Sequence, residues 1–167
     1  MRMALRFVLL AVLVMIQGSL LPLWLPRLYF YPALLLLAVY TFRLERPWVL
    51  GLALWTGLIA DMLYGEGVGL FMLTHYAAMA VALTIPRHML DYPLVVLGLR
   101  LFAALVVHEL VQLVVMYVTG TGSDLFYALR VSSGLVLVAN TALFALFLLY
   151  VHLRGGDSVR RLLEVEK

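Results

Sequence analysis

Long stretches without a single Asp, Glu, Lys or Arg constrain this chain more than any other feature. Three of them are Phe7–Pro26, Gly67–Pro86 and Val131–Leu153. A membrane-crossing helix needs about 20 mostly apolar residues, and these stretches lack the alternation of a barrel strand. The 167 residues are 65% hydrophobic and 13% charged, which is too apolar for a soluble domain. The sequence therefore predicts an all-α polytopic membrane protein.

Two shorter apolar stretches and one that contains charged residues complete the set of predicted transmembrane spans. Residues 28–43 and 47–63 gain length if their flanking arginines reach the lipid headgroups. Residues 94–118 include Arg100, His108 and Glu109, so they span only if these side chains face protein or water. We predict one six-helix transmembrane domain, 1–153, with spans 5–22, 28–43, 47–63, 68–86, 94–118 and 130–152, followed by a short basic tail, 154–167.

The distribution of Lys and Arg predicts the orientation. Nine of the twelve lie on the side of both termini, two on the opposite side, and Arg100 within a span. Both termini are therefore expected in the cytoplasm. Arg2 and Arg6 before an apolar run also fit a signal peptide, but Gln17-Gly18-Ser19 is a poor cleavage site, so we expect a retained helix. The net charge of +3 orients the chain and predicts no nucleic-acid partner. The tail suits anionic lipid or a cytoplasmic partner.

Two sequence patterns resemble catalytic motifs, and both are incomplete. His108-Glu109 begins a His-Glu-x-x-His metal motif, but Gln112 stands where the second histidine is required. Ser132-Ser133-Gly134 resembles the serine motif of rhomboid proteases, but Val131 replaces its glycine. The chain has no cysteine to supply a thiolate nucleophile or metal ligand. We predict no enzyme, no metal site and no cofactor.

Ionisable side chains within spans cost about 2.5–3.5 kcal/mol each on insertion scales, so each is expected to be paired, solvated or functional. Several polar residues lie in the predicted outer half of the bundle, where two interpretations remain open. They line an outward-opening pocket, or they form pairs between helices, for example Arg130 with Asp61. The candidates are Asp61, His75, His108, Glu109, Gln112 and Arg130.

Glycines at a regular spacing connect the third span to the fourth. The pattern is Gly51-x5-Gly57-x3-Asp61-x3-Gly65-x3-Gly69. Glycines allow close approach of helix backbones and tight turns, so the pattern predicts either helix packing or a binding loop. We expect Asp61→Asn to leave the protein folded while abolishing its function.

This stretch, Gly51 to Gly65 followed by Gly67-Val68-Gly69-Leu70, resembles the signature of the bacterial rod shape-determining MreD family. Gly57, Asp61, Gly65 and Gly69 are the residues that match it. The resemblance implies a non-enzymatic multi-pass protein of the bacterial inner (plasma) membrane. It would act with MreC in the elongation complex, beside RodA, the elongation transpeptidase and MreB, and couple peptidoglycan synthesis to cell shape.

The MreD family is in turn similar in fold to the S-components of energy-coupling-factor transporters. This similarity implies an alternative function, a substrate-binding or transport subunit that uses the outer polar residues. A scaffold is expected to co-purify with a single-span partner, whereas a binding subunit is expected to associate with an ATPase module.

Overall fold

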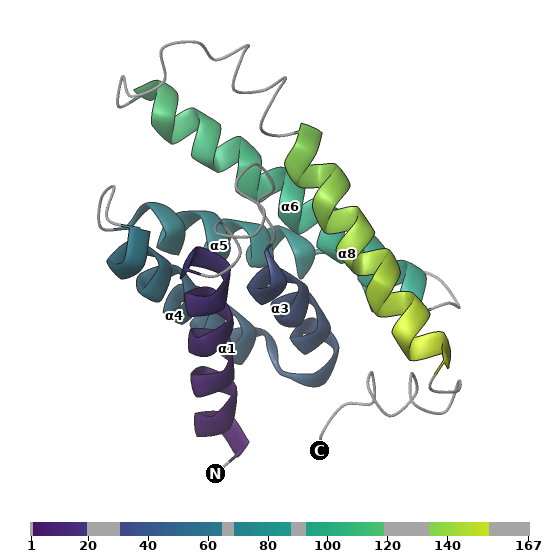
Figure 1. Ribbon diagram of the computed structural model, residues 1–167. Helices are drawn as coiled ribbons and strands as arrows, with labels where there is room; N and C mark the ends of the chain where they lie inside the picture. Colours follow the sequence, from purple (N-terminus) through teal and green to yellow (C-terminus); the bar gives the residue numbers. More distant parts are fainter. Residues whose placement is uncertain (1, 20–30, 65–68, 88–92, 119–133, 154–167) are drawn as a thin grey trace.

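The computed structural model describes residues 2–19, 31–64, 69–87, 93–118 and 134–153. Within these ranges the chain is helical and contains no strand (Figure 1), so the all-α prediction is confirmed. The helices are α1 (Arg2–Ser19), α3 (Pro32–Arg43), α4 (Arg46–Tyr64), α5 (Leu70–Ala82), α6 (Pro93–Val118) and α8 (Gly134–Leu153).

The helix α5 is shorter than the predicted span 68–86. It begins after Gly69 and ends at Ala82, and the chain then forms turns in which the N–H of Thr84 donates to Val81 O and that of Ile85 to Ala82 O. Pro86 explains this early end, because the residue before a proline is disfavoured in the α conformation and the proline itself has no N–H to donate.

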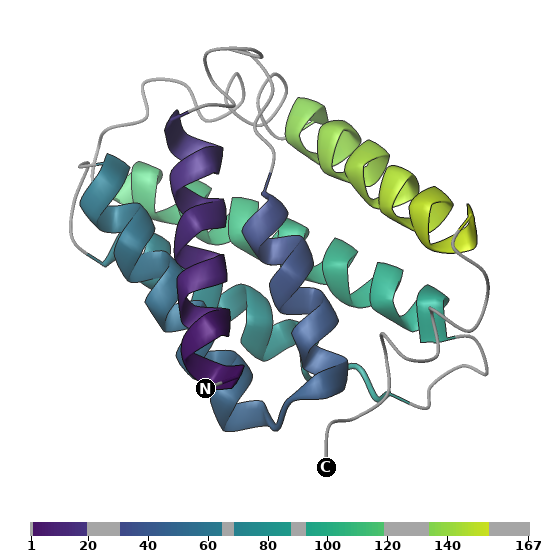
Figure 2. The ribbon, with the colours of Figure 1, turned by 60° about the horizontal axis from the view of Figure 1, so that its bottom comes forward.

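The centre of the bundle is α5, which packs closely against α4 on one side and α6 on the other. The helices α1 and α3 lie side by side across this layer (Figure 2), and α8 packs against α6, away from α1. The hydrophobic core is mostly aliphatic. Its fully buried members include Leu10, Leu34, Leu37, Leu52, Met79 and Leu97.

One segment of the described residues, Leu94–Val115 in α6, is long and apolar enough to cross a membrane by length and composition. The same helix exposes large apolar side chains three or four residues apart, which places them along one face. They are Val95, Leu99, Phe102, Val106, Leu110 and Val114. Arg100 and His108 of this helix are buried in the protein, as a membrane-spanning segment requires. These features are compatible with the predicted membrane location.

Candidate functional site

Asp61 near the end of α4 binds the beginning of α5. Its carboxylate accepts the backbone N–H groups of Gly69 at 2.9 Å, Phe71 at 2.8 Å and Met72 at 3.2 Å. The first N–H groups of a helix have no partner within the helix, and a negative charge there is favoured by the helix dipole. The residue is 4% exposed. Asp61 is therefore an N-terminal cap that α4 supplies to α5.

Gly57, one helical turn before Asp61, allows the close approach that this capping needs. A Cβ atom at this position would lie 2.5 Å from Phe71 O and 2.6 Å from Met72 N. These are backbone atoms of the same turn that Asp61 caps, and they cannot move aside as a flexible side chain would. Gly57 and Asp61 therefore serve one contact, between the last turns of α4 and the first turn of α5.

The other glycines of the pattern differ from Gly57. Gly69 has φ of +107°, a conformation that favours glycine, but a Cβ added there would meet no atom within 4 Å. Its role is conformational, not the close packing that the pattern suggested. Gly51 also has open space around it, so close approach does not explain this glycine. Gly65 lies outside the described residues.

Two histidines from different helices meet in the interior, His75 of α5 and His108 of α6. Their ring centroids are 5.3 Å apart with an interplanar angle of 54°. Exposed fractions are 1% for His75 and 0% for His108. His75 Nδ1 lies 2.9 Å from Phe71 O, and His108 Nδ1 lies 3.4 Å from Glu109 Oε1. The two Nε2 atoms are buried and have no hydrogen-bond partner among the residues that the structure describes. We call these two residues the histidine pair.

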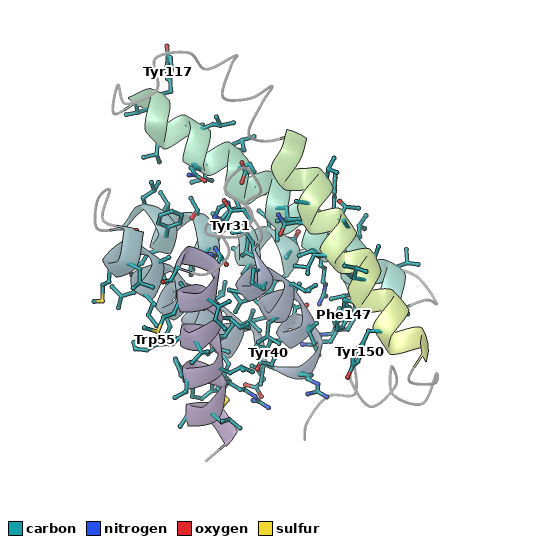
Figure 3. The ribbon with its side chains drawn as sticks, in the orientation of Figure 1. Tyr31, Tyr40, Trp55, Tyr117, Phe147 and Tyr150 are labelled. Carbon is teal, nitrogen blue, oxygen red and sulfur yellow. The ribbon has the colours of Figure 1, made fainter. Side chains whose placement is uncertain are left out.

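Tyr31, which precedes α3, connects the histidine pair to α8. Its ring centroid lies 4.6 Å from that of His108, and its backbone N–H donates to Asn140 Oδ1 at 2.7 Å. Figure 3 shows Tyr31 at the beginning of α3, between that helix and α6. Tyr31 thus contacts His108 of α6 through its ring and Asn140 of α8 through its backbone. Tyr31 was not among the sequence candidates, since an aromatic residue before a proline carries no functional signal.

Of the remaining candidates, Glu109 contacts His108, and Gln112 is half-buried one turn further along α6. Arg130 lies outside the described residues, so the predicted pair with Asp61 lies there as well. In the part of the chain that the structure describes, no group of three or more His, Cys, Asp or Glu side chains is placed to hold a metal ion.

Arg100 of α6 is a second buried charge that the candidate set did not include. Its Nη2 donates to Ile85 O at 2.6 Å, and its Nη1 donates to Thr41 Oγ1 at 2.7 Å and to Thr41 O at 3.2 Å. The guanidinium carbon lies 4.6 Å from the ring centroid of Phe42. Arg100 therefore joins the last turn of α3 to the turn that follows α5.

Comparisons of the chain with protein families, with curated proteins and with solved structures find no match.

Proposed function

We propose that the chain is a non-enzymatic, multi-pass inner-membrane component of the bacterial elongation complex, acting with MreC to couple peptidoglycan synthesis to cell shape. The observation that carries the proposal is the contact made by Gly57 and Asp61. Of the residues that carry the MreD resemblance, the described ones, Gly57, Asp61 and Gly69, lie at one connection between α4 and α5. Such a connection suits a protein that acts by presenting helices to partners.

The proposal includes six transmembrane helices with both termini in the cytoplasm and the turn 65–69 on the opposite side. The asymmetry of Lys and Arg and the apolar face of α6 support it. Reporter fusions at Lys167 and in the turn test this arrangement. A tail reporter that is active only outside the cytoplasm would contradict it.

The partner assignment is tested by isolating the tagged chain from native membranes and identifying the bound proteins. We expect recovery of MreC, with RodA, the elongation transpeptidase and MreB as further members of the complex, whatever solute is present. Gly57→Leu should lose the partner, because the side chain collides with the first turn of α5. Gly51→Leu is the matched control, since its glycine has open surroundings.

A second function, a substrate-binding subunit similar to an S-component, is favoured by one specific observation. The two Nε2 atoms of the histidine pair are buried and have no partner within the described ranges, and such atoms are costly unless a ligand satisfies them. Recovery of an ATPase module instead of MreC, together with stabilisation by a solute, would support this function and contradict the first.

A further inference from the structure

The hydrogen bonds of the histidine pair indicate which nitrogen of each ring carries the hydrogen. The partner of His75 Nδ1 is a carbonyl oxygen, which can only accept, so Nδ1 carries the hydrogen. The partner of His108 Nδ1 is a carboxylate oxygen, which also accepts. With the hydrogen on Nδ1, the Nε2 atom of each ring is left as a possible metal ligand. The two Nε2 atoms have no hydrogen-bond partner among the described residues, and they belong to neighbouring rings.

This arrangement is typical of histidines that bind metal ions. A histidine ligand usually donates its second ring N–H to a backbone carbonyl or a carboxylate, which orients the ring and increases its basicity. His75 has the carbonyl and His108 has the carboxylate. Neutral imidazole nitrogens suit zinc, copper and nickel ions, whereas magnesium and calcium prefer oxygen ligands.

The spacing of the rings is compatible with one shared metal ion. With metal–nitrogen bonds of about 2.0–2.1 Å and tetrahedral angles, the centroids of two imidazoles on one ion lie ~5.2 Å apart. With hydrogen bonds of about 2.9 Å to one water molecule, the same construction separates the centroids by ~6.6 Å. The observed separation of 5.3 Å is close to the value for a shared ion, and it also lies in the range of directly packed rings.

We propose that His75 and His108 bind one divalent transition-metal ion of the zinc class through their Nε2 atoms. Glu109 is a positioning residue that orients the ring of His108. Since no third ligand stands among the described residues, the ion keeps coordination positions for water or an exchangeable ligand. The sequence predicts no metal site, because the His108-Glu109 motif lacks its second histidine and the chain has no cysteine; the proposal departs from that prediction by using His75 of α5 as the second ligand. The proposal does not depend on the MreC assignment.

The test uses the full chain, purified in detergent with a tag free of histidine and titrated with Zn²⁺ and Co²⁺. We expect saturable binding of one ion per chain, and an X-ray absorption spectrum of the zinc complex that shows two imidazole ligands. His75→Gln and His108→Gln should each weaken binding ~100-fold or more. Glu109→Gln, which keeps both Nε2 atoms, should weaken it about 10-fold.

The matched control is the double variant His88→Gln/His152→Gln, which removes the two other histidines of the chain and should bind the ion as the unchanged protein does. Folding of each variant is checked by size-exclusion chromatography and circular dichroism. Absence of saturable binding, a zinc spectrum without imidazole, or undiminished binding by folded His108→Gln would overturn the proposal. The zinc spectrum of the double variant, in which only His75 and His108 remain, tests the proposal even if His75→Gln or His108→Gln fails to fold.

Discussion

The two ends of α5 are each held by a buried charged side chain from a neighbouring helix, but the two arrangements differ. At the beginning, Asp61 of α4 accepts three N–H groups from one short segment, residues 69–72. Beyond the other end, Arg100 of α6 donates to carbonyl oxygens of two separate segments, Thr41 and Ile85. The anion therefore secures the start of one helix, whereas the cation joins two parts of the fold.

This difference follows from the shapes of the side chains. A carboxylate has two adjacent oxygens and suits a cluster of converging N–H groups. A guanidinium has five donors spread over a plane and reaches acceptors on different sides. The charge at each end matches the helix dipole, negative at the N-terminus and positive at the C-terminus. We therefore expect the two ends to respond differently to conservative substitutions.

The largest loss of folded protein is expected at the contact between Gly57 and the first turn of α5. Gly57→Leu should abolish folded protein, because even a Cβ atom overlaps the backbone of Phe71 and Met72. The measurement is the folded yield after detergent extraction. Gly51→Ala, in open surroundings, should keep or raise stability by about 0.5–1 kcal/mol through better helix propensity. Equal yields for Gly57→Leu and the control would break the close-packing argument.

A smaller loss of stability is expected when Arg100, which lies beyond the C-terminal end of α5, is replaced. Arg100→Met should lower the free energy of unfolding by ~3 kcal/mol, because buried carbonyl oxygens of Thr41 and Ile85 lose their donor. Arg100→Lys should recover only part of this loss, since one ammonium cannot reproduce the planar spread of donors. Thermal unfolding of the two variants measures the difference, and full recovery by Lys would show that charge alone suffices.

Asp61→Asn should destabilise the protein by ~2 kcal/mol. One carboxylate oxygen becomes an NH₂ group that faces a backbone N–H, so at least one of the three bonds is lost. The MreD-like motif alone predicted a folded but inactive variant. Unfolding and rescue of rod shape, measured together, separate the two expectations. If Asp61→Asn keeps its stability but fails to rescue rod shape, Asp61 has a direct functional role.

The smallest expected effect is the coupling energy between Asp61 and Arg100, which lie at opposite ends of α5. The N-cap and the turn at Ile85 are separated by the 13 residues of α5, and sites so far apart usually add within about 0.5 kcal/mol. The double variant Asp61→Asn/Arg100→Lys should therefore lose the sum of the single losses. A clearly larger or smaller loss in thermal unfolding would mean that the two ends act as one unit.

Local sequence pattern was sufficient to predict that the chain is helical. Apolar runs and prolines determine where helices begin and end within one segment, so α6 matches its predicted span almost residue for residue. The role of Arg100 could not be predicted in this way, because its partners are backbone carbonyls that every residue possesses. A search for its partner among carboxylates would fail.

The contact between the two histidines of the candidate site also could not be predicted from spacing along the sequence. His75 and His108 were both chosen as polar residues in apolar spans, but their contact depends on how α5 packs against α6. Sequence spacing reports neighbours on one helix, such as His108 and Gln112, and carries no information about a ring from another helix. The contact between His75 and His108 was therefore not predicted.

The shortness of α5 has a consequence for the bilayer if, as proposed, the bundle spans a membrane. Its 13 residues rise only ~20 Å, whereas the hydrocarbon core of a bilayer is ~30 Å thick. In that bilayer the carbonyl of Ile85 would find in Arg100 the donor that water would otherwise supply. The hydrophobic mismatch would draw the leaflets together beside the exposed side chains of α5, where short-chain lipids would fit best.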